Sequence, residues 1–510
     1  MEQLIQDKIL SWDDLDVRLD SHRREGKIIV QSHGVFDLIH PGIIKHLSSA
    51  KTQGDILVVS IIKDKDVRRG PGRPVFPEEF RMENVASLAQ VDYVCLVDDD
   101  VPFDCVKRIN PDVLARGQEW KERDYKIHDT VFNEENKHTL GKSRVFETAG
   151  FPLSSSQIVN NFLDIYPKET KDFLKEFSNK YSFHDIVDRL NQLKDLKVLL
   201  IGDGIIDEYN YCESMGKSAK AHLVVSRYLS HEIFAGGAFA IANHVSGLCD
   251  KVELVTLLGK EDSKEDFILS NLNPKISTKF FYREDGPTIV KKRYINQYLN
   301  QKLFEINFLN DSHINGNSEA DVVDYLKTAI PEYDLVLVSD FGHGFITDKI
   351  IKVIEEYSPK YAVNTQTNSA NAGYNMVTKY SNPSYVCLDE PELRLTAQRK
   401  YTEIENVARN ISRTLNTDFL VVTMGKRGSL GVNGKTGANR TPVFSSKVVD
   451  TVGAGDAFFA FTAPCFAQGM PMDMVSFIGN SVGALAVQVV CNKKPVQKHE
   501  LLEFINALLK

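Results

Sequence analysis

Short apolar segments recur along the chain, and each is followed by a turn or by a helix-forming stretch. The first part of the chain contains KIIVQSHG, DILVVSII and DYVCLVDD, and the later part contains KVLLIGDG, KVELVTLLG, DLVLVSDFG, SYVCLDE and FLVVTMG. Strands that are apolar on both faces belong to parallel sheets that helices cover on both sides. The pattern therefore predicts an α/β protein built from βα units.

The alternation of strands and helices lapses between about residues 164 and 195, where the sequence becomes charged and helix-friendly. A chain of 510 residues is too long for one ordinary core and fits two or three domains. We place the domain boundary in the charged segment. The predicted parts are an N-terminal domain over residues 1–165, a helical linker over 166–192 and a C-terminal domain over 193–510.

The composition limits the partners that we expect. The formal net charge is -8, so the chain shows no basic balance that would indicate nucleic acid. The first residues, MEQLIQDKILSWDDLD, lack the basic and apolar regions of a signal peptide, and no window has the apolar length of a membrane span. We therefore expect a cytoplasmic protein without a membrane partner. The seven cysteines are scattered and never in C-x-x-C spacing, which favours buried thiols over zinc or disulfide sites.

The motif KVVDTVGAGDAFFA, residues 447–460, carries the clearest chemistry. Gly453, Ala454 and Gly455 would expose consecutive backbone N–H groups at the start of an apolar helix, which makes an anion hole for a moving phosphoryl group. Asp456 would then lie at the helix start, where it could accept a hydroxyl proton. The spacing is not that of a Walker P-loop.

This D-T-x-G-A-G-D sequence resembles the signature of ribokinase-like (PfkB) carbohydrate kinases, and the resemblance covers residues 193–510. It implies a ribokinase-like α/β domain with a small β lid, Mg²⁺ and ATP as cofactor and phosphoryl donor, and Asp456 as the catalytic base. It further implies that Asp203, Asp207, Gly236 and Gly237 contact the sugar, that Thr423, Gly425, Gly428 and Asn480 contact ATP, and that Glu392 acts indirectly on Mg²⁺.

Two positions depart from the family pattern. Ala240 stands where the family usually has an asparagine three residues after the glycine pair, and Asp389 replaces the asparagine of an N-x-x-E magnesium motif. The SDFGHG segment supplies Asp340 and Gly344 in the expected order. The departure at Ala240 leaves the identity of the sugar open.

The segment PTIVKKRYINQYLNQKLFEIN alternates like a pair of lid strands. Alternation places Lys291 and Arg293 on one face, where they could bind a phosphate that the sugar already carries. A solvated strand face is the alternative interpretation. If the first interpretation holds, the acceptor is a sugar phosphate.

A second motif lies near the N-terminus, in IIVQSHGVFDLIHPGIIKHLSSAK, residues 28–51. A glycine-bearing loop between a strand and a helix suits a phosphate chain, and a histidine in it could polarise the phosphates. The loop resembles G-x-F-D-x-x-H-x-G-H of the cytidylyltransferase-like family, which implies a Rossmann-like nucleotidyltransferase domain over roughly residues 25–165. The matching residues are Gly34, Phe36, Asp37, His40 and Gly42.

The family's second histidine is replaced by Ile43. Loss of one histidine should weaken stabilisation of charge on the α-phosphate, and His46, three residues on, is one candidate to compensate. The resemblance also implies nucleotide or phosphate contacts for Arg81 and Arg116, and for Ser154 and Ser155 in the late LSSSQIVNNF segment.

The two halves together resemble bifunctional heptose 7-phosphate kinase and heptose 1-phosphate nucleotidyltransferase enzymes of bacterial surface-polysaccharide synthesis, with the domain order reversed. The resemblance implies that a kinase product is then activated with ATP or CTP to a nucleotide-sugar. Two alternatives stay open: a kinase with a non-catalytic N-terminal nucleotide-binding module, and a sugar-nucleotide sensor without turnover. Ribokinase-like kinases often pair through their lid strands, which implies a homodimer.

Overall fold

The computed structural model describes residues 2–67, 70–98, 103–117, 143–148, 158–160, 165–299, 301–314, 316–433, 437–445 and 448–510. The chain divides into two compact units, one formed by Met1–Pro167 with Leu502–Lys510 and the other by Lys168–Leu501. The finer boundaries that we drew at residues 165 and 192 stay a prediction.

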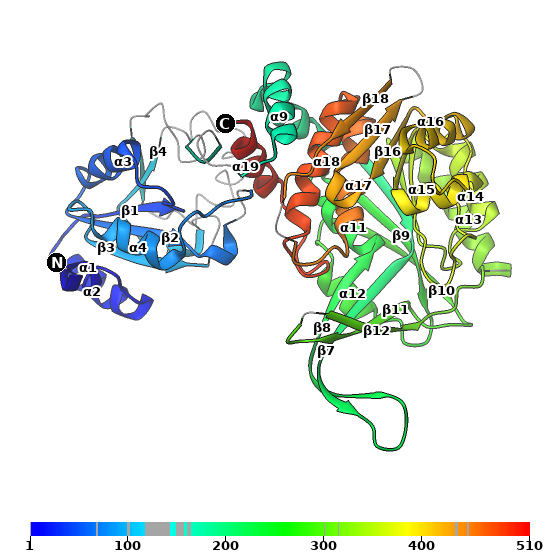
Figure 1. The fold of residues 1–510 in the computed structure, drawn as a ribbon, viewed down its shortest axis with the longest axis horizontal. Coiled ribbons are helices and arrows are strands. Elements are labelled where there is room, and N and C mark those ends of the chain that lie inside the picture. The colour runs from blue at the N-terminus through cyan, green and yellow to red at the C-terminus, as the bar shows by residue number, and fades with distance from the viewer. Residues whose placement is uncertain are drawn as a thin grey trace. The chain divides into compact units, whose positions relative to one another are not determined.

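The first unit contains a five-stranded sheet in the order β3-β2-β1-β4-β5, in which every neighbouring pair is parallel (Figure 1). Its strands are β1 (Ile29–Gly34), β2 (Ile56–Ile62), β3 (Tyr93–Val97), β4 (Val113–Gly117) and β5 (Arg144–Thr148). Its helices include α1 (Glu2–Gln6), α2 (Trp12–Arg24), α3 (Pro41–Lys51), α4 (Glu78–Ala86) and α5 (Phe103–Ile109).

Both faces of this sheet are buried. Adjacent residues of β1 point to opposite faces: Ile29 packs with Leu15 and Leu19 of α2, whereas Val30 packs with Leu47 of α3. The continuous apolar runs of the sequence follow from this two-sided burial. The prediction of a Rossmann-like domain is therefore confirmed.

The second unit contains a nine-stranded sheet in the order β10-β9-β6-β13-β14-β15-β16-β17-β18. The seven strands from β10 to β16 in this order are parallel, β17 pairs antiparallel with β16, and β18 pairs antiparallel with β17. The strands are β6 (Lys197–Gly202), β9 (Lys251–Gly259), β10 (Ile276–Arg283), β13 (Leu335–Asp340), β14 (Tyr361–Thr365), β15 (Tyr385–Asp389), β16 (Phe419–Thr423), β17 (Ser429–Asn433) and β18 (Gly437–Thr441).

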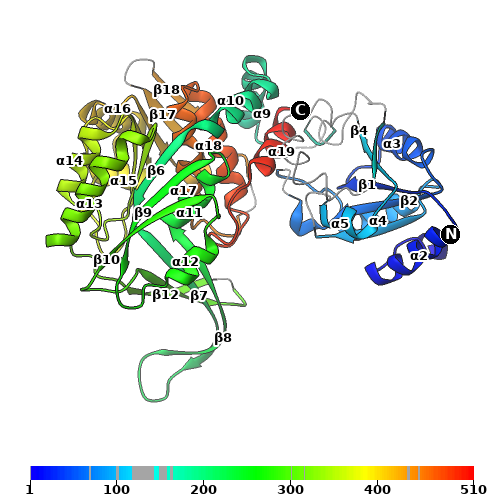
Figure 2. The same ribbon diagram turned by 180° about the vertical axis from the view of Figure 1, so that it is seen from behind.

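Helices cover both faces of the large sheet, as the two opposite views show (Figures 1 and 2). One group is α11 (Ala238–Ser246), α17 (Ala454–Ala467) and α18 (Met472–Ala486), and the other is α13 (Gly316–Ala329), α14 (Asp348–Tyr357), α15 (Glu390–Ala397) and α16 (Ile404–Leu415). The unit also contains α9 (Lys168–Lys180), α10 (Phe183–Asn191) and α12 (Glu265–Asn271), and α19 (Lys498–Leu509) follows near the end of the chain.

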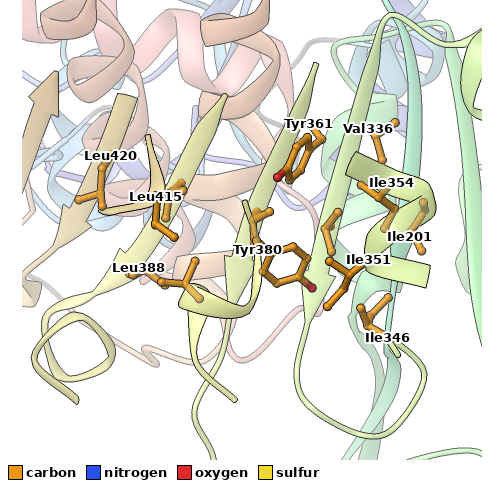
Figure 3. Packing of buried hydrophobic residues seen from close by; sticks show 14 of the residues in the cluster. Ile201, Val336, Ile346, Ile351, Ile354, Tyr361, Tyr380, Leu388, Leu415 and Leu420 are labelled. Carbon is orange, nitrogen blue, oxygen red and sulfur yellow. The ribbon is translucent and has the colours of Figure 1, made fainter. Parts of the chain in front are cut away.

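The core beneath the second helix group is continuous from strand to strand. Val336 of β13, Ile354 of α14 and Leu420 of β16 are fully buried in one cluster, part of which Figure 3 shows. The βα connections bring these distant segments together, because each helix folds back onto the strands that flank it.

A separate four-stranded sheet in the order β12-β11-β7-β8 forms the predicted lid. Its strands are β7 (Gly204–Lys217), β8 (Val224–Gly237), β11 (Val290–Asn296) and β12 (Gln301–Phe308). The pairing of β11 with β12 is antiparallel, as the alternation in residues 287–307 predicted. The hairpin of β7 and β8 extends away from the rest of the unit (Figure 1).

All seven cysteines are buried free thiols, as their spacing predicted. Among the helices that the structure describes, none combines the length and the apolar character needed to cross a bilayer.

Candidate active site

The second unit contains a cavity of about 400 Å³ between the lid and the carboxyl ends of the parallel strands. Asp207 and Lys291 line it from the lid, Asp389 and Thr423 from the last residues of β15 and β16, and Asp456 from α17. Open α/β sheets bind their ligands at this end of the strands.

The start of α17 borders the cavity. Gly453 is the N-cap of this helix, and Gly453 and Gly455 both line the cavity. Gly453 has a φ of +84°, and a Cβ there would lie 2.1 Å from Oδ1 of Asn492, so only glycine fits. No heavy atom lies within 4 Å of a Cβ placed on Gly455. The N–H of Ala454 donates to the carbonyl of Thr451 at 3.3 Å, whereas no described residue accepts from the N–H groups of Gly455 and Asp456, which are therefore open to an anion.

Asp456 lies in the first turn of α17 and is 6% exposed. Burial raises the pKa of its carboxyl to about 7, and the charge of Asp207 adds to this rise. A hydrogen bond from Gln366 and the charge of Lys291 act in the opposite direction on the pKa. A carboxyl that titrates near neutrality suits a general base.

Asp207 and Arg293 form an ion pair at the lid wall of the cavity. The guanidinium also pairs with Oε2 of Glu305 at 2.8 Å, so two carboxylates already neutralise it. Gly236 makes room for this arrangement, because a Cβ there would lie 2.1 Å from Oδ2 of Asp207. Arg293 is therefore a structural partner of Asp207 in this structure and not a free anion-binding group.

Lys291 lies on the same face of β11, as the alternation predicted, but in a different environment. It is 7% exposed, so the solvated-face interpretation is wrong for this residue. Its Nζ lies 5.8 Å from the ring centroid of Phe341, and it makes no hydrogen bond or ion pair with other described residues. Burial lowers the pKa of its ammonium group.

Asp203 does not line the cavity. Its carboxylate accepts hydrogen bonds from the backbone N–H groups of Phe341 at 2.9 Å and His343 at 3.4 Å. It therefore orients the loop after β13, whereas Gly237, with a φ of +55°, does line the cavity. Burial, together with the nearby Asp340, raises the pKa of Asp203 to about 7.

The other residues that we expected to contact ATP lie at the end of β16, in the turn after it and in α18. Thr423 lines the cavity, whereas Gly425 and Gly428 do not. Gly428 has a φ of +76°, and a Cβ there would lie 2.0 Å from the carbonyl oxygen of Thr441. Asn480 donates hydrogen bonds to the carbonyls of Thr441 and Pro442, at 2.8 and 3.0 Å, and is not part of the cavity lining.

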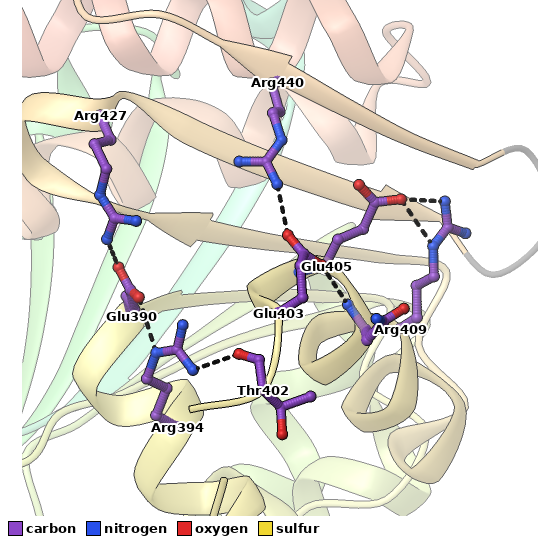
Figure 4. A network of polar contacts seen from close by, with 9 residues as sticks. Glu390, Arg394, Thr402, Glu403, Glu405, Arg409, Arg427 and Arg440 are labelled. Atoms are coloured by element: carbon purple, nitrogen blue, oxygen red, sulfur yellow. Dashed lines mark hydrogen bonds and ion pairs between the residues drawn. The ribbon is translucent and has the colours of Figure 1, made fainter. Parts of the chain in front are cut away.

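A polar network fastens this turn to helix α15 (Figure 4). Arg427 pairs with Glu390, the first residue of α15, and Arg394 pairs with the same carboxylate at 2.8 Å. Arg394 also donates to the carbonyl of Thr402 at 2.8 Å. The Thr423 turn and the Asp389 end of α15 are thereby held together at one end of the cavity.

Asp389 and Glu392 form a capping box at the start of α15. The side chain of Asp389 accepts from the N–H of Glu392 at 2.7 Å, and Glu392 accepts from the N–H groups of Asp389 at 2.9 Å and Thr367 at 3.0 Å. Burial and the charge of Asp389 raise the pKa of Glu392. The described residues contain no cluster of three or more ligand side chains for a metal, but two carboxylates at a phosphate site fit Mg²⁺, which takes most of its ligands from phosphates and water.

Several residues that line the cavity were not predicted from the sequence. They are Asn307, Phe341, His343, Asn364, Gln366, Asn368 and Asn492. His343 and Gln366 each follow the end of a buried parallel strand, β13 and β14, and this position was the available signal.

The predicted nucleotidyltransferase loop of the first unit joins β1 to α3. Gly34 ends β1, and His40 is the N-cap of α3, with its Nδ1 accepting from the N–H of Gly42 at 3.1 Å. The carboxylate of Asp37 accepts from the N–H groups of Val75 and Phe76, at 2.8 and 2.9 Å. Burial raises the pKa of Asp37. Phe36 has a φ of +51° in this loop.

Arg81 does not make the nucleotide contact that the resemblance implied. It is fully buried, and its guanidinium donates to the carbonyls of Val35, Ile62 and Phe76 at 2.6 to 3.1 Å and pairs with Asp64 at 2.7 Å. Its donors are thus used inside the protein, which corrects the expected triphosphate contact to a structural role.

Ile43 packs against the core cluster beneath α3. His46 does not compensate for the missing histidine in this structure, because its Nε2 contacts the hydroxyl of Ser32 at 2.8 Å and its Nδ1 that of Thr148 at 2.7 Å. Arg116 lies near the end of β4, where burial lowers its pKa to about 10. Ser154 and Ser155 lie outside the described residues.

Comparison with known families agrees with this geometry. The model of the pfkB family of carbohydrate kinases matches residues 195–497. The chain belongs to the pfkB carbohydrate kinase family. Residues 32–161 match the cytidylyltransferase-like family, so this pfkB-family chain carries that domain ahead of its kinase domain. The prediction of a carbohydrate kinase with a nucleotidyltransferase-like domain is confirmed at the level of families.

Curated relatives of this pfkB-family chain are named bifunctional protein HldE. The protein of Methylobacillus flagellatus is 40% identical over 118 residues, which are 23% of this chain and 24% of the relative. The protein of Histophilus somni is 23% identical over 321 residues, 62% of this chain and 64% of the relative. These matches therefore span from about a quarter to under two thirds of the relatives' length.

Solved structures agree on the fold of the pfkB-family domain. Escherichia coli phosphofructokinase-2 matches with a TM-score of 0.50 and 14% identity, over 62% of this chain and 100% of its own. Thermotoga maritima ribokinase matches with a TM-score of 0.50 and 18% identity, over 61% of this chain and 99% of its own. The predicted ribokinase-like α/β fold is confirmed.

Proposed function

We propose that the second unit transfers the γ-phosphoryl group of ATP to a sugar hydroxyl, with Asp456 as the general base. The observation that carries this proposal is the position of Asp456 beside the start of α17, where Gly453 and Gly455 line the same cavity. The carboxylate takes the hydroxyl proton, and the sugar oxygen forms a bond to the γ-phosphorus as the bond to ADP breaks. The N–H groups of the first turn hold the transferring group in line.

Mg²⁺ neutralises charge on the ATP phosphates when it is bound. Asp389 and Glu392 would hold it through water or phosphate oxygens, because both carboxylates line the cavity next to Thr423. Gln366 positions Asp456 by its hydrogen bond to Oδ1 at 2.6 Å.

The acceptor that we propose is a sugar phosphate such as a heptose 7-phosphate. Support comes from the buried ammonium group of Lys291 in the cavity wall and from the resemblance to bifunctional heptose enzymes. We further propose that the first unit joins the sugar 1-phosphate to a nucleotide from ATP or CTP and releases pyrophosphate. The product is then a nucleotide-sugar for surface polysaccharide, made in the cytoplasm, where both nucleotides are available.

A second candidate function is a sugar kinase whose first unit binds a nucleotide without catalysis. Two observations favour it: Ile43, where the family has a histidine, packs against the core cluster, and both nitrogens of His46 contact hydroxyl groups. The loop residues Asp37 and His40 retain the family pattern, which favours a working transferase.

The experiment that tests the proposal is a mass-spectrometric screen of the full chain with Mg-ATP and CTP against heptose, hexose and pentose phosphates. We expect a nucleotide-sugar with the wild type and, with Asp456→Ala, only when sugar 1-phosphate is supplied. Accumulation of a sugar bisphosphate alone would favour the second candidate. A large gain in nucleotidyl transfer with Ile43→His would show that the missing histidine limits the activity of the natural loop. Absence of any phosphorylated product across the panel would refute the kinase assignment for these acceptors.

We also propose a homodimer that pairs through the lid. The support is the exposure of large apolar side chains on the lid strands. They include Leu223, Val224, Tyr228 and Leu229 of β8 and its turn, and Phe304, Ile306 and Phe308 of β12. Exposed apolar groups at a sheet edge are typical of a surface that another chain covers.

A further inference from the structure

His343 is a buried histidine that the reaction described above does not use. The residue is 2% exposed, and it lines the cavity. Neither ring nitrogen has a hydrogen-bond partner within the described part of the chain. A buried imidazole without partners is unfavourable, and proteins seldom retain one unless a ligand or water completes it.

The backbone of the loop after β13, which carries His343, is held in place by close packing and hydrogen bonds. Gly342 and Gly344 flank it with φ values of +67° and +86°, and a Cβ on Gly344 would lie 2.1 Å from the carbonyl oxygen of Ser312. The side chains of Asn368 and Asn371 donate to the carbonyl of Phe341 at 2.8 and 2.7 Å. The unpartnered ring therefore belongs to a well-supported loop.

Lys291 is the charged neighbour of this ring. Its Nζ lies 5.8 Å from the ring of Phe341, two residues before His343, and both side chains line the same cavity. Burial and the charge of Lys291 lower the pKa of His343 to about 3, so the ring is neutral near pH 7 and offers one donor and one acceptor.

None of the carboxylates that line the cavity forms an ion pair with Lys291. Asp207 and Glu305 both pair with Arg293, and Asp456 accepts a hydrogen bond from Gln366. Asp389 and Glu392 cap helix α15. A buried ammonium group that forms no ion pair is stabilised when an anion enters the cavity beside it.

We propose that Lys291 and His343 together bind the phosphate group that the acceptor sugar already carries. This inference rests on the proposed kinase function and assigns the phosphate to Lys291 and His343 instead of Arg293. The ammonium group supplies charge, and the ring N–H donates to a phosphate oxygen. The neutralised Arg293 holds Asp207 in position and does not take part in phosphate recognition.

Equilibrium binding to the full chain tests the subsite without turnover. The probes are fructose 6-phosphate, sedoheptulose 7-phosphate, the corresponding free sugars and glucuronate, measured by calorimetry. We expect the wild type to bind at least one sugar phosphate about tenfold to a hundredfold more tightly than the free sugar. Lys291→Met and His343→Asn should each reduce this ratio about tenfold or more, and Lys291→Arg should retain most of it.

Lys292→Met is the matched control, because Lys292 is the next residue of β11 and pairs with Glu208 at 3.1 Å outside the cavity lining. It should leave the ratio unchanged. The proposal is overturned if both Lys291→Met and His343→Asn keep the wild-type ratio, if they weaken free sugars and sugar phosphates equally, or if Lys291 is needed only for glucuronate.

Kinase assays separate this inference from the proposed function. Phosphorylation that depends on Asp456 but shows no preference for phosphorylated sugars would refute the subsite and leave the kinase standing. Binding of sugar phosphates that depends on Lys291, without phosphoryl transfer from ATP to any of them, would support the subsite and count against the kinase assignment.

Discussion

The side-chain amide nitrogen of Gln366 lies 2.6 Å from Oδ1 of Asp456 and donates a hydrogen bond to it. The same amide nitrogen donates to Oδ1 of Asn364 at 3.2 Å. Both amide protons of Gln366 are therefore used to fix one orientation. This hydrogen bond favours the charged carboxylate and opposes the rise in pKa that burial causes.

Replacing Gln366 with leucine should move the acid limb of the kcat profile to higher pH. Asp456 must be deprotonated to act as a base, and its pKa, about 7 in the wild type, rises when the donor is lost. We expect a shift of about one pH unit and a loss of about tenfold in kcat at pH 6. Gln468→Leu, at an exposed position, is the control. An unchanged profile would mean that Gln366 does not position the base.

Gly236→Ala should disable the acceptor site without an added charge or polar group. The new Cβ would lie 2.1 Å from Oδ2 of Asp207, so the carboxylate must move away from Arg293. We expect kcat/KM for the acceptor to fall about a hundredfold. Gly483→Ala is the control, because no heavy atom lies within 4 Å of its Cβ. Equal kcat/KM values for the two variants would contradict the proposed role of Gly236 in making room for the carboxylate of Asp207.

Arg293→Met should loosen the lid. The substitution leaves Asp207 and Glu305 without their shared cation, and breaking a buried ion pair costs about 3–5 kcal/mol. Hydrogen exchange of peptides from β7 and β11 should become faster in this variant. Lys292→Met removes the more exposed ion pair with Glu208. It should lower the free energy of local opening, measured by hydrogen exchange, by no more than about 1 kcal/mol. Wild-type protection in Arg293→Met would refute the prediction.

Arg81→Met should destabilise the first unit by at least about 3 kcal/mol, because the buried carbonyls of Val35 and Ile62 lose their donor. Both tryptophans, Trp12 and Trp120, lie before residue 168, so urea unfolding followed by tryptophan fluorescence reports on this unit. Arg18→Met, at an exposed position, should have little effect. If Arg81 only contacted nucleotide, stability without ligand would not change.

A charge on the lid should dissociate the proposed dimer. Leu229 is 41% exposed and Ile306 is 43% exposed, so aspartate there would place a charge in a covered surface but disturb the isolated lid little. We expect sedimentation to change from dimer to monomer in the double variant. Tyr401→Asp, at a residue that is 90% exposed and outside the lid, should remain dimeric. A monomeric wild type would refute the homodimer.

Much of the fold was predictable from local sequence. The apolar runs that became β6, β9, β13, β15 and β16 were visible, because strands buried on both faces must be apolar throughout. The start of α17 was equally visible, since Gly453 precedes an apolar helix and carries a backbone conformation that other residues avoid.

Side-chain partners were not predictable in the same way. The sequence places Lys291 and Arg293 on one strand face. It does not reveal that Asp207 and Glu305 form ion pairs with Arg293 and not with Lys291. A basic residue in the right motif position also suggested a nucleotide contact for Arg81, which the fold buries among carbonyl groups. Partner choice depends on which strands become neighbours.

By itself the sequence determined the α/β class, the glycine turn before Asp456 and the pairing of a cytidylyltransferase-like with a pfkB-family domain, because these depend on local periodicity and on motifs of a few residues. Only the tertiary structure decided that Gln366 meets Asp456 and that His343 and Lys291 share one cavity. The physical reason is distance along the chain: these residues belong to segments that are far apart in the sequence, and only the packing of the large sheet, the lid and helix α17 brings them to one cavity.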